Sequence, residues 1–439
     1  MDALPDDALA GVLGRLPAAR RVCRSWRGVV DGRRLLLPHL LPHSVAGLFG
    51  NYYDHETPHF FARRPTPPPE HAVAGRGLRR IDGRFSFVTV RREKPFAWHS
   101  VLDHCNGLVL FRDDDLYVCN PATRRWACLP PPPPPSSSRR RRRPSSGDDW
   151  HCHWRRALVA FDPAASPYFE VLLVPLEPHH KKQMDRHGDD GRKTSEDGGT
   201  LETMEWPPAT WTWQVISSRT RRWEERVFVR EGAAAGTVAG LLLNSEGPQW
   251  PSHAYCQGKL YLHCRGEYVT RLSTSTNKCQ VIKLPIIDQA ECHKRVESVI
   301  GRSRNSSGDK MEWQLKHQSV VNYPGYEQRG FDDGPWIIDD LYKTKGEEEQ
   351  NEGGWSSDND DVVINDIVDN NDGSDDDNKG YVSLAGFHPY KEVIFLLVHG
   401  ETVVAYHLNS RKAQYLGQMS PRTYNRGLHE SFVYTPCMF

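Results

Sequence analysis

Long apolar runs are missing from this chain of 439 residues. The longest uninterrupted run, Val393–Val398, covers six residues, whereas a membrane-spanning helix needs about 18. The N-terminal residues include Asp2, Asp6 and Asp7 and lack the basic flank and apolar core of a secretory leader. We therefore expect no membrane partner and a location in the nucleus, the cytoplasm or both.

Closely spaced cysteine pairs are missing as well. None of the ten Cys residues forms a C-x-x-C pair, the spacing that is typical of zinc and redox sites. In an intracellular chain this pattern favours reduced, mostly packed thiols over a disulfide framework. The sequence therefore predicts no disulfide framework. It also predicts no cofactor, because Gly75-Arg76-Gly77 lacks the third glycine of a dinucleotide loop and no Walker sequence appears.

A net charge of one sign is the third absence. Lys+Arg and Asp+Glu both total 56, which argues against nucleic acid as a partner. Aromatic residues, in contrast, are plentiful, with 13 Trp, 16 Tyr and 15 Phe. A wholly disordered chain would carry far fewer aromatics, so this composition indicates folded domains.

Two short amphipathic helices are predicted at the N-terminus, over 4–16 and 22–30. Apolar residues recur in both at the three- and four-residue spacing of one helix face. Two such short helices cannot bury both faces against each other, and we expect some of this surface to meet a partner or the rest of the chain. The apolar residues are Leu9, Val12, Leu13 and Leu16 in the first helix, and Val22, Trp26, Val29 and Val30 in the second.

Beyond about residue 80 the pattern changes to short apolar runs bounded by Gly, Pro, Asn, Asp and Ser, which predicts the strands of a mainly β domain. Between pairs of strands a turn signature recurs: NPATRRW (120–126), SSRTRRW (217–223), STSTNKC (273–279) and NSRKAQY (409–415). The apolar runs are Phe85–Val90, Gly107–Phe111, Ala157–Phe161, Val171–Val174, Trp213–Ile216, Lys259–His263, Val393–Val398 and Val403–His407.

The spacing of these turns approximates multiples of 45–50 residues, the period of propeller blades. FDPAASPYFEVLLV (161–174) and FHPYKEVIFLLV (387–398) form a second echo. About 300 residues remain outside the polar insertions, enough for about six or seven blades. The pattern fits neither the WD40 nor the kelch signature, and a Greek-key sandwich stays open as the alternative fold.

Three low-complexity insertions interrupt the β region, near 129–150, 177–205 and 346–379. The first is rich in proline and arginine, the second in His, Lys and Asp, and the third holds 13 acidic residues. We interpret all three as disordered polar segments. The predicted domains are a helical module over 1–45 and a large β-domain over 46–439.

The N-terminal sequences LPDDALAGVLGRLP and VCRSWRGVV resemble the first and last parts of an F-box. The β region, with HCNGLVLF (104–111), NPATRRW and VIKLP (281–285), is similar to the associated domain of plant F-box proteins. This resemblance implies binding to a Skp-type adaptor and, through it, to a cullin scaffold. It assigns adaptor contacts to Leu4, Pro5, Leu9, Leu13, Leu16, Val22, Cys23 and Trp26.

The F-box pattern is shortened in its middle, because only five residues separate Leu16 from Val22. The function expected from the resemblance is substrate recognition in a ubiquitin ligase, with an unknown target protein bound by the β-domain. Such a subunit is not itself an enzyme. The alternative is a non-ligase interaction scaffold with a degenerate F-box, or two helices that simply cap the β-domain.

HETPH (55–59) matches the zinc-protease motif H-E-x-x-H, which requires two His residues one helical turn apart. Pro58 disfavours a helix here, and we interpret the match as chance. His151-Cys152-His153 and His179-His180 lack a second ligand cluster at a recognisable spacing, so the sequence predicts no metal site. No set of nucleophile, base and orienting residue can be assembled.

The five consecutive arginines Arg139, Arg140, Arg141, Arg142 and Arg143 match a nuclear-localisation or anion-binding tract. A solvated charge run in a linker explains them equally well. Removing the 13 acids of 346–378 from the 56 in the chain leaves 43 acidic against 56 basic residues. The body of the chain is therefore basic, which weakens the argument against polyanionic partners.

Overall fold

The computed structural model describes 18 parts of the chain, and the structural statements below concern these residues only. They comprise most of the β region and one N-terminal helix. They are residues 13, 23–32, 44–53, 55–63, 81–89, 99–113, 115–132, 157–175, 203–243, 252–263, 268–285, 299–302, 313, 315, 317–318, 334–338, 382–421 and 427–438.

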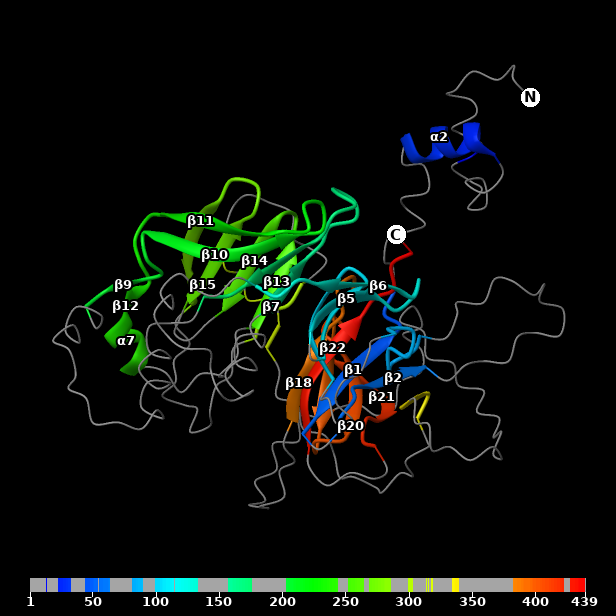
Figure 1. The fold of residues 1–439 in the computed structure, drawn as a ribbon. Coiled ribbons are helices and arrows are strands. Elements are labelled where there is room, and N and C mark those ends of the chain that lie inside the picture. The colour runs from blue at the N-terminus through cyan, green and yellow to red at the C-terminus, as the bar shows by residue number, and fades with distance from the viewer. Residues whose placement is uncertain are drawn as a thin grey trace, which may run out of the picture.

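The protein is mainly β, as the sequence predicted (Figure 1). In the described parts of the chain, the helices α2 (Arg24–Gly32) and α7 (Val238–Leu243) accompany the strands. Among the described helices, none combines the length and the apolar character needed to cross a lipid bilayer. None of the cysteines described by the structure forms a disulfide.

Two sheets are simple four-stranded antiparallel meanders in chain order. Hairpin turns connect neighbouring strands, and near-continuous apolar runs in the middle strands β4, β5, β19 and β20 explain why these strands are buried on both faces. One comprises β3 (Ser100–Cys105), β4 (Leu108–Arg112), β5 (Leu116–Asn120) and β6 (Arg125–Leu129). The other comprises β18 (Val382–Phe387), β19 (Val393–Val398), β20 (Thr402–His407) and β21 (Lys412–Gln418).

A third sheet has eight strands and contains two further meanders. Their fourth strands, β11 and β16, pair in parallel through Val229–Glu231 and Lys278–Gln280. The first half comprises β7 (Ala157–Ala160), β8 (Glu170–Leu173), β10 (Thr210–Ser217) and β11 (Trp223–Glu231). The second comprises β13 (Ser252–Cys256), β14 (Lys259–His263), β15 (Tyr268–Ser273) and β16 (Lys278–Lys283).

The last four-stranded sheet joins distant parts of the chain in the order β17, β2, β1, β22. The C-terminal strand β22 pairs along the whole of β1. A separate two-stranded sheet, β9 (Glu205–Trp206) with β12 (Gly236–Thr237), packs on the eight-stranded sheet through Trp206. The four strands are β1 (Gly47–Tyr52), β2 (His59–Arg63), β17 (Trp336–Ile338) and β22 (Leu428–Tyr434).

The recurring turn signature marks the connection between the third and fourth strands of four meanders. Its fifth residue has a positive φ each time: 56° at Arg124, 55° at Arg221, 55° at Asn277 and 58° at Arg411. In the fourth turn the signature begins at His407, whose carbonyl accepts the Arg411 N–H at 2.8 Å. The predicted register NSRKAQY was therefore two residues late, and Ala413 takes the place assigned to Tyr415.

The prediction of a strand over Phe85–Val90 was wrong. Residues 85–89 form turns and irregular backbone. Asp82 accepts hydrogen bonds from the backbone N–H of Arg84 and of Ser86, and Phe85 has a φ of 53°. This local side-chain bonding competes with strand pairing, while the Phe85 ring stays buried, stacked at 5.3 Å on Phe49.

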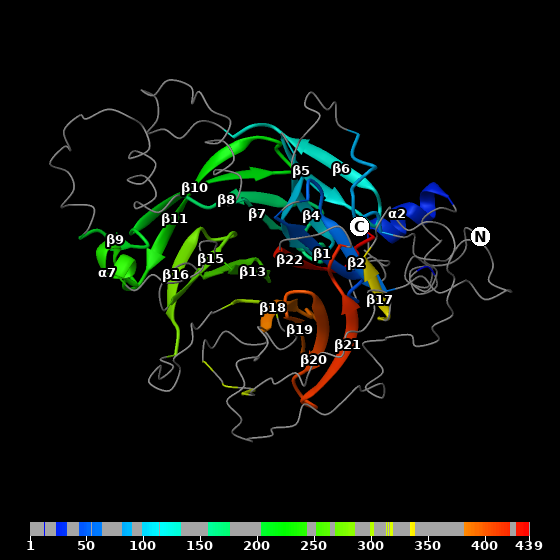
Figure 2. The same cartoon turned by 90° about the horizontal axis from the view of Figure 1, so that it is seen from below.

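The first strands of the meanders gather near the middle of the molecule and the fourth strands lie outside (Figure 2). Apolar clusters fill the spaces between neighbouring sheets. One packs β3–β6 against β7, with Leu110 and Val118 facing Val159; another packs Phe61 and Trp336 against β19 and β20. Each fully buried large apolar side chain stabilises the folded chain by about 1.5–3 kcal/mol.

Candidate functional site

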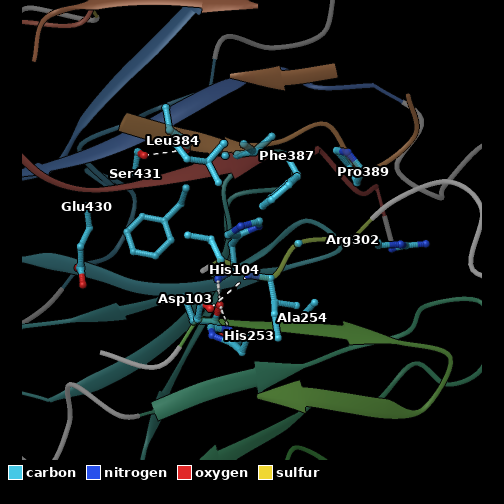
Figure 3. A pocket seen from close by; sticks show the side chains of 18 of the residues that line it. Asp103, His104, His253, Ala254, Arg302, Leu384, Phe387, Pro389, Glu430 and Ser431 are labelled. Atoms are coloured by element: carbon cyan, nitrogen blue, oxygen red, sulfur yellow. Dashed lines mark hydrogen bonds and ion pairs between the residues drawn. The ribbon is translucent and has the colours of Figure 1, made fainter. Parts of the chain in front are cut away.

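A cavity of about 640 Å³ lies where the first strands meet. Volumes of about 300–1,000 Å³ are usual for small-ligand sites. Its lining comes from β3, β7, β13, β18 and β22 and from residues 299–302. Its acidic, basic and histidine side chains are Asp103, His104, His253, Arg302, His429 and Glu430. Figure 3 shows Arg302 and Glu430 at opposite ends, with Asp103, His104 and His253 between them.

Asp103 is the central acid of the pocket, with 2% of its surface exposed. A β-bulge between Val101 and Asp103 shifts the register of β3, and such bulges re-aim the side chains that follow them. One carboxylate oxygen accepts the Val159 N–H of β7 at 2.6 Å. The other accepts the N–H of His104 at 2.6 Å.

His253 reaches Asp103 from β13, with 2.8 Å between His253 Nε2 and Asp103 Oδ1. The carboxylate is an acceptor, so Nε2 carries the proton in this bond. The Asp103 side chain is 3% exposed and the His253 side chain 17%. One acid thus holds together the first strands of three meanders, β3, β7 and β13.

His104, the next residue on β3, is a neutral imidazole at pH 7. Burial lowers the pKa of His104 from its ordinary value of 6.5; Asp103 opposes this effect and His253 adds to it. Desolvation therefore outweighs the neighbouring carboxylate.

Arg302 lies at the end of the pocket where the first strands finish. Its Nη1 donates to Asn106 Oδ1 at 2.7 Å, and its guanidinium carbon lies 5.8 Å from the centre of the Tyr390 ring. Asn106 is fixed in turn, because its Nδ2 donates to the Phe161 carbonyl at 2.6 Å. Asn106 and Tyr390, the two side chains that contact the Arg302 cation in the described residues, are both uncharged.

Glu430 marks the opposite end of the pocket. It accepts a hydrogen bond from Asn51 Nδ2 at 3.2 Å and lies 3.8 Å from His429 Nδ1. Its side chain is 35% exposed. The pocket is therefore electrostatically polar, with a cation at one end and acids in the middle and at the other end.

The thiol and two of the hydroxyls that line the pocket have structural surroundings. Burial raises the pKa of the Cys105 thiol to about 12, so it is not a nucleophile at neutral pH. Ser252 Oγ accepts the N–H of Ile300, and Ser431 Oγ donates to the Ala385 carbonyl at 2.7 Å. These hydroxyls hold strands together.

The predicted adaptor-binding residues fall only partly within the described residues. Cys23 is exposed, and its Sγ accepts the N–H of Trp26 at 3.4 Å at the start of α2. Trp26 is half-buried, and Leu13 is buried. The helix begins at Arg24 rather than at Val22. Outside the described residues lie Leu4, Pro5, Leu9, Leu16 and Val22, the arginines Arg139–Arg143, and His151-Cys152-His153 and His179-His180.

The HETPH match does not form the helix that a zinc site of this type requires. His59 starts β2 and His55 precedes it in a loop, with His59 Nε2 and His55 Nδ1 2.9 Å apart. Within the part of the chain that the structure describes, no group of three or more His, Cys, Asp or Glu side chains could hold a metal ion.

Sequence reasoning missed Asp103, His104, His253 and Arg302. The first and third of these are 150 residues apart, so no local motif connects them. One signal was present: Cys105-Asn106-Gly107 and Cys256-Gln257-Gly258 are similar tripeptides that follow β3 and β13. Both form turns with two successive positive φ angles, which identifies β3 and β13 as equivalent strands.

Comparisons with protein-family models, with curated proteins and with solved structures found no match to this chain.

Proposed function

We propose that the chain is a substrate-recognition subunit of a Skp-cullin-F-box type ubiquitin ligase. The observation that carries the proposal is the helix α2, which forms within the F-box-like sequence VCRSWRGVV and leaves Trp26 half-exposed. A half-exposed tryptophan on a short helix is suited to a protein contact. In the proposed complex, residues 4–30 bind the adaptor.

We further propose that the β-domain is a propeller of six blades. Four meanders and the composite sheet β17-β2-β1-β22 account for five blades. Residues 299–302 supply the inner edge of the sixth, because Ile300 bonds to Ser252 of β13 and Gly301 packs on the ring of Phe387 at the end of β18. The pairing of β22 with β1 is the expected closure of such a ring.

The mechanism of the proposed subunit is proximity. The β-domain binds a target protein, and the adaptor and cullin scaffold hold a ubiquitin-charged enzyme nearby. Tethering raises the effective concentration of target lysines at that enzyme. The chain needs no catalytic residue, and its place of action is the nucleus or the cytoplasm.

The test is retention of a purified Skp-type adaptor by the full-length chain. We expect binding that falls about tenfold or more in Trp26→Ala, since tryptophan anchors dominate interface energies. Trp126→Ala is the matched control, because Trp126 is an exposed tryptophan of β6. An intact F-box protein serves as the positive control, and if only that protein retains the adaptor the proposal is wrong.

The second candidate is an interaction scaffold without ligase contacts. It is favoured by the short link of five residues between Leu16 and Val22, about a turn and a half of helix less than the family pattern. Proximity labelling in cells separates the two. A ligase subunit labels adaptor and cullin only when residues 1–30 are present. For a scaffold, the set of labelled proteins does not change when residues 1–30 are removed.

A further inference from the structure

We infer that the central pocket binds an apolar organic acid whose carboxylate pairs with Arg302. The inference does not rest on adaptor binding, because the pocket lies wholly within the β-domain and its occupancy can be measured in the isolated full-length chain.

Arg302 brings a positive charge to one end of the pocket. Its guanidinium lies at the pocket end, half-buried, and uses one of its five N–H donors on the Asn106 amide oxygen. Within the described residues no carboxylate forms an ion pair with it. A cation withdrawn from water without a counter-charge is costly, so an anionic ligand would gain both a charge partner and several donors.

The second argument is pre-organisation. Asn106 lies in the β3–β4 turn with a φ of 46° and is anchored to the Phe161 carbonyl. The Tyr390 ring supports the guanidinium from another side. Arg302 is thus held by two fixed groups, which lowers the conformational entropy lost when a ligand binds.

The acids of the pocket limit the negative charge that a ligand can carry. Buried Asp103 and the carboxylate of Glu430 lie farther along the cavity (Figure 3). Both disfavour a second negative charge on the ligand. A polyphosphate is therefore a poor fit, and a single anionic group at the Arg302 end is favoured.

The fourth argument is the lining around that end. Phe387 of β18 faces Ala254 of β13 across the cavity and Pro389 lies near Arg302, while Leu384 lines the cavity farther along, beside Ser431 (Figure 3). These side chains offer an apolar surface to the body of the ligand. The shared chemistry, a carboxylate on an apolar body, is found in small organic acids and at the C-terminal end of a peptide.

The test uses two fluorescent probes of similar shape. 8-Anilinonaphthalene-1-sulfonate carries one anionic group, and N-phenyl-1-naphthylamine carries none. We expect saturable binding of the anionic probe that weakens about tenfold or more in Arg302→Gln, with binding of the neutral probe unchanged. Arg302→Lys should bind the anionic probe with intermediate affinity, because the charge is kept and the fork geometry is lost.

Arg411→Gln is the matched control, since Arg411 is exposed in the β20–β21 turn; it should bind both probes like the natural chain. Equal affinity of the natural chain for the two probes would overturn the inference. So would anionic-probe binding that is unchanged in Arg302→Gln. Loss of binding of both probes in this variant, with Arg302→Lys also binding equally weakly, would assign Arg302 a structural role instead.

Displacement of the anionic probe then identifies the source of the ligand. 3-Phenylpropionate is compared with its amide, and N-acetyl-Leu-Phe with its C-terminal amide. Stronger displacement by 3-phenylpropionate indicates a small acid, and stronger displacement by the peptide acid indicates a chain end. If neither acid displaces the probe better than its amide, the carboxylate assignment is wrong.

Discussion

The meander β3–β6 and the meander β13–β16 share one plan but differ at their outer edges. Both begin at the pocket, both turn at a Cys-Asn/Gln-Gly sequence, and each supplies one partner of the Asp103–His253 pair. However, β16 is paired on both sides, by β15 and β11. In contrast, β6 is an edge strand with four exposed residues.

The inner and outer strands are therefore under different structural constraints. The inner strands must meet at one point, and their turns keep the same geometry in both meanders. The outer strands must only avoid unwanted pairing. β11 covers the edge of β16, whereas β6 begins with a charged residue, Arg125, as exposed edges often do.

The largest expected loss of stability follows from a change that breaks the contact between the two meanders. Asp103→Ala removes the acceptor of two backbone N–H groups and of His253. Removing one partner of a buried pair costs about 3–5 kcal/mol, which denaturant unfolding would measure. Asp115→Ala, at an exposed site on the same sheet, should stay within about 0.5 kcal/mol. Equal effects of the two changes would contradict the central role of Asp103.

The second prediction compares the same turn in both meanders. Gly107 and Gly258 have φ values of 88° and 73°, so an alanine at either site costs about 1–2 kcal/mol of backbone strain. A Cβ at Gly107 would lie 2.2 Å from the Cβ of Cys437, whereas Gly258 has open space. Overpacking adds about 1–3 kcal/mol at Gly107 only.

Thermal or denaturant unfolding of Gly107→Ala and Gly258→Ala measures this difference, and each variant is the control for the other. Equal destabilisation would mean that the turn beside Cys437 can move away at no cost. The two meanders would then be interchangeable at this point.

The third prediction concerns protons at the junction. The pKa of His104 is lowered in the folded chain by burial, so below about pH 6.5 the unfolded chain binds more protons at this residue. Stability is therefore lost as pH falls from 6.5 toward the folded-state pKa. His104→Gln should flatten this part of the stability curve, as measured by unfolding at pH 7.5, 6.5 and 5.5. Parallel curves for the two proteins would contradict the lowered pKa.

The smallest effect is expected at the outer junction of β11 and β16. Glu231 accepts from Lys278 at 2.5 Å and from Gln280 at 2.7 Å, but both charged side chains are exposed. Exposed ion pairs are screened by water and salt. Glu231→Gln should leave the unfolding midpoint unchanged at 0.5 M salt, and a clear loss there would show that this pair holds the eight-stranded sheet together.

Local features of the fold were predictable from the sequence because they depend on neighbouring residues. Val393–Val398 is β19 as predicted, since β-branched and aromatic residues form a run between turn residues. The repeated turns were visible because each needs a residue that tolerates positive φ. The prediction of a strand over Phe85–Val90 was wrong because a nearby residue, Asp82, imposes a turn through its hydrogen bonds to the backbone.

The candidate site was not predictable in the same way. Asp103, His253 and Arg302 line one pocket only after three separate segments have folded, and none of them belongs to a motif. Strand β1 was missed because Gly47 and Gly50 make GLFGNY a weak strand sequence. In the folded chain a Cβ at Gly50 would lie 2.7 Å from Met419 and one at Gly47 2.4 Å from the Phe61 carbonyl. Tertiary packing selects glycine there against its local propensity.

The pairing of β1 with β22 has a consequence for biosynthesis. Residues 64–427 are made after β2 and before β22, and at about 5–20 residues per second the ribosome needs roughly 20–70 s for them. During that time β1 exposes an unpaired edge to other chains and to chaperones. A message truncated before codon 428 would leave this edge open permanently. The edge of β1 is therefore covered only once residues 428–434 have been made and have paired with it.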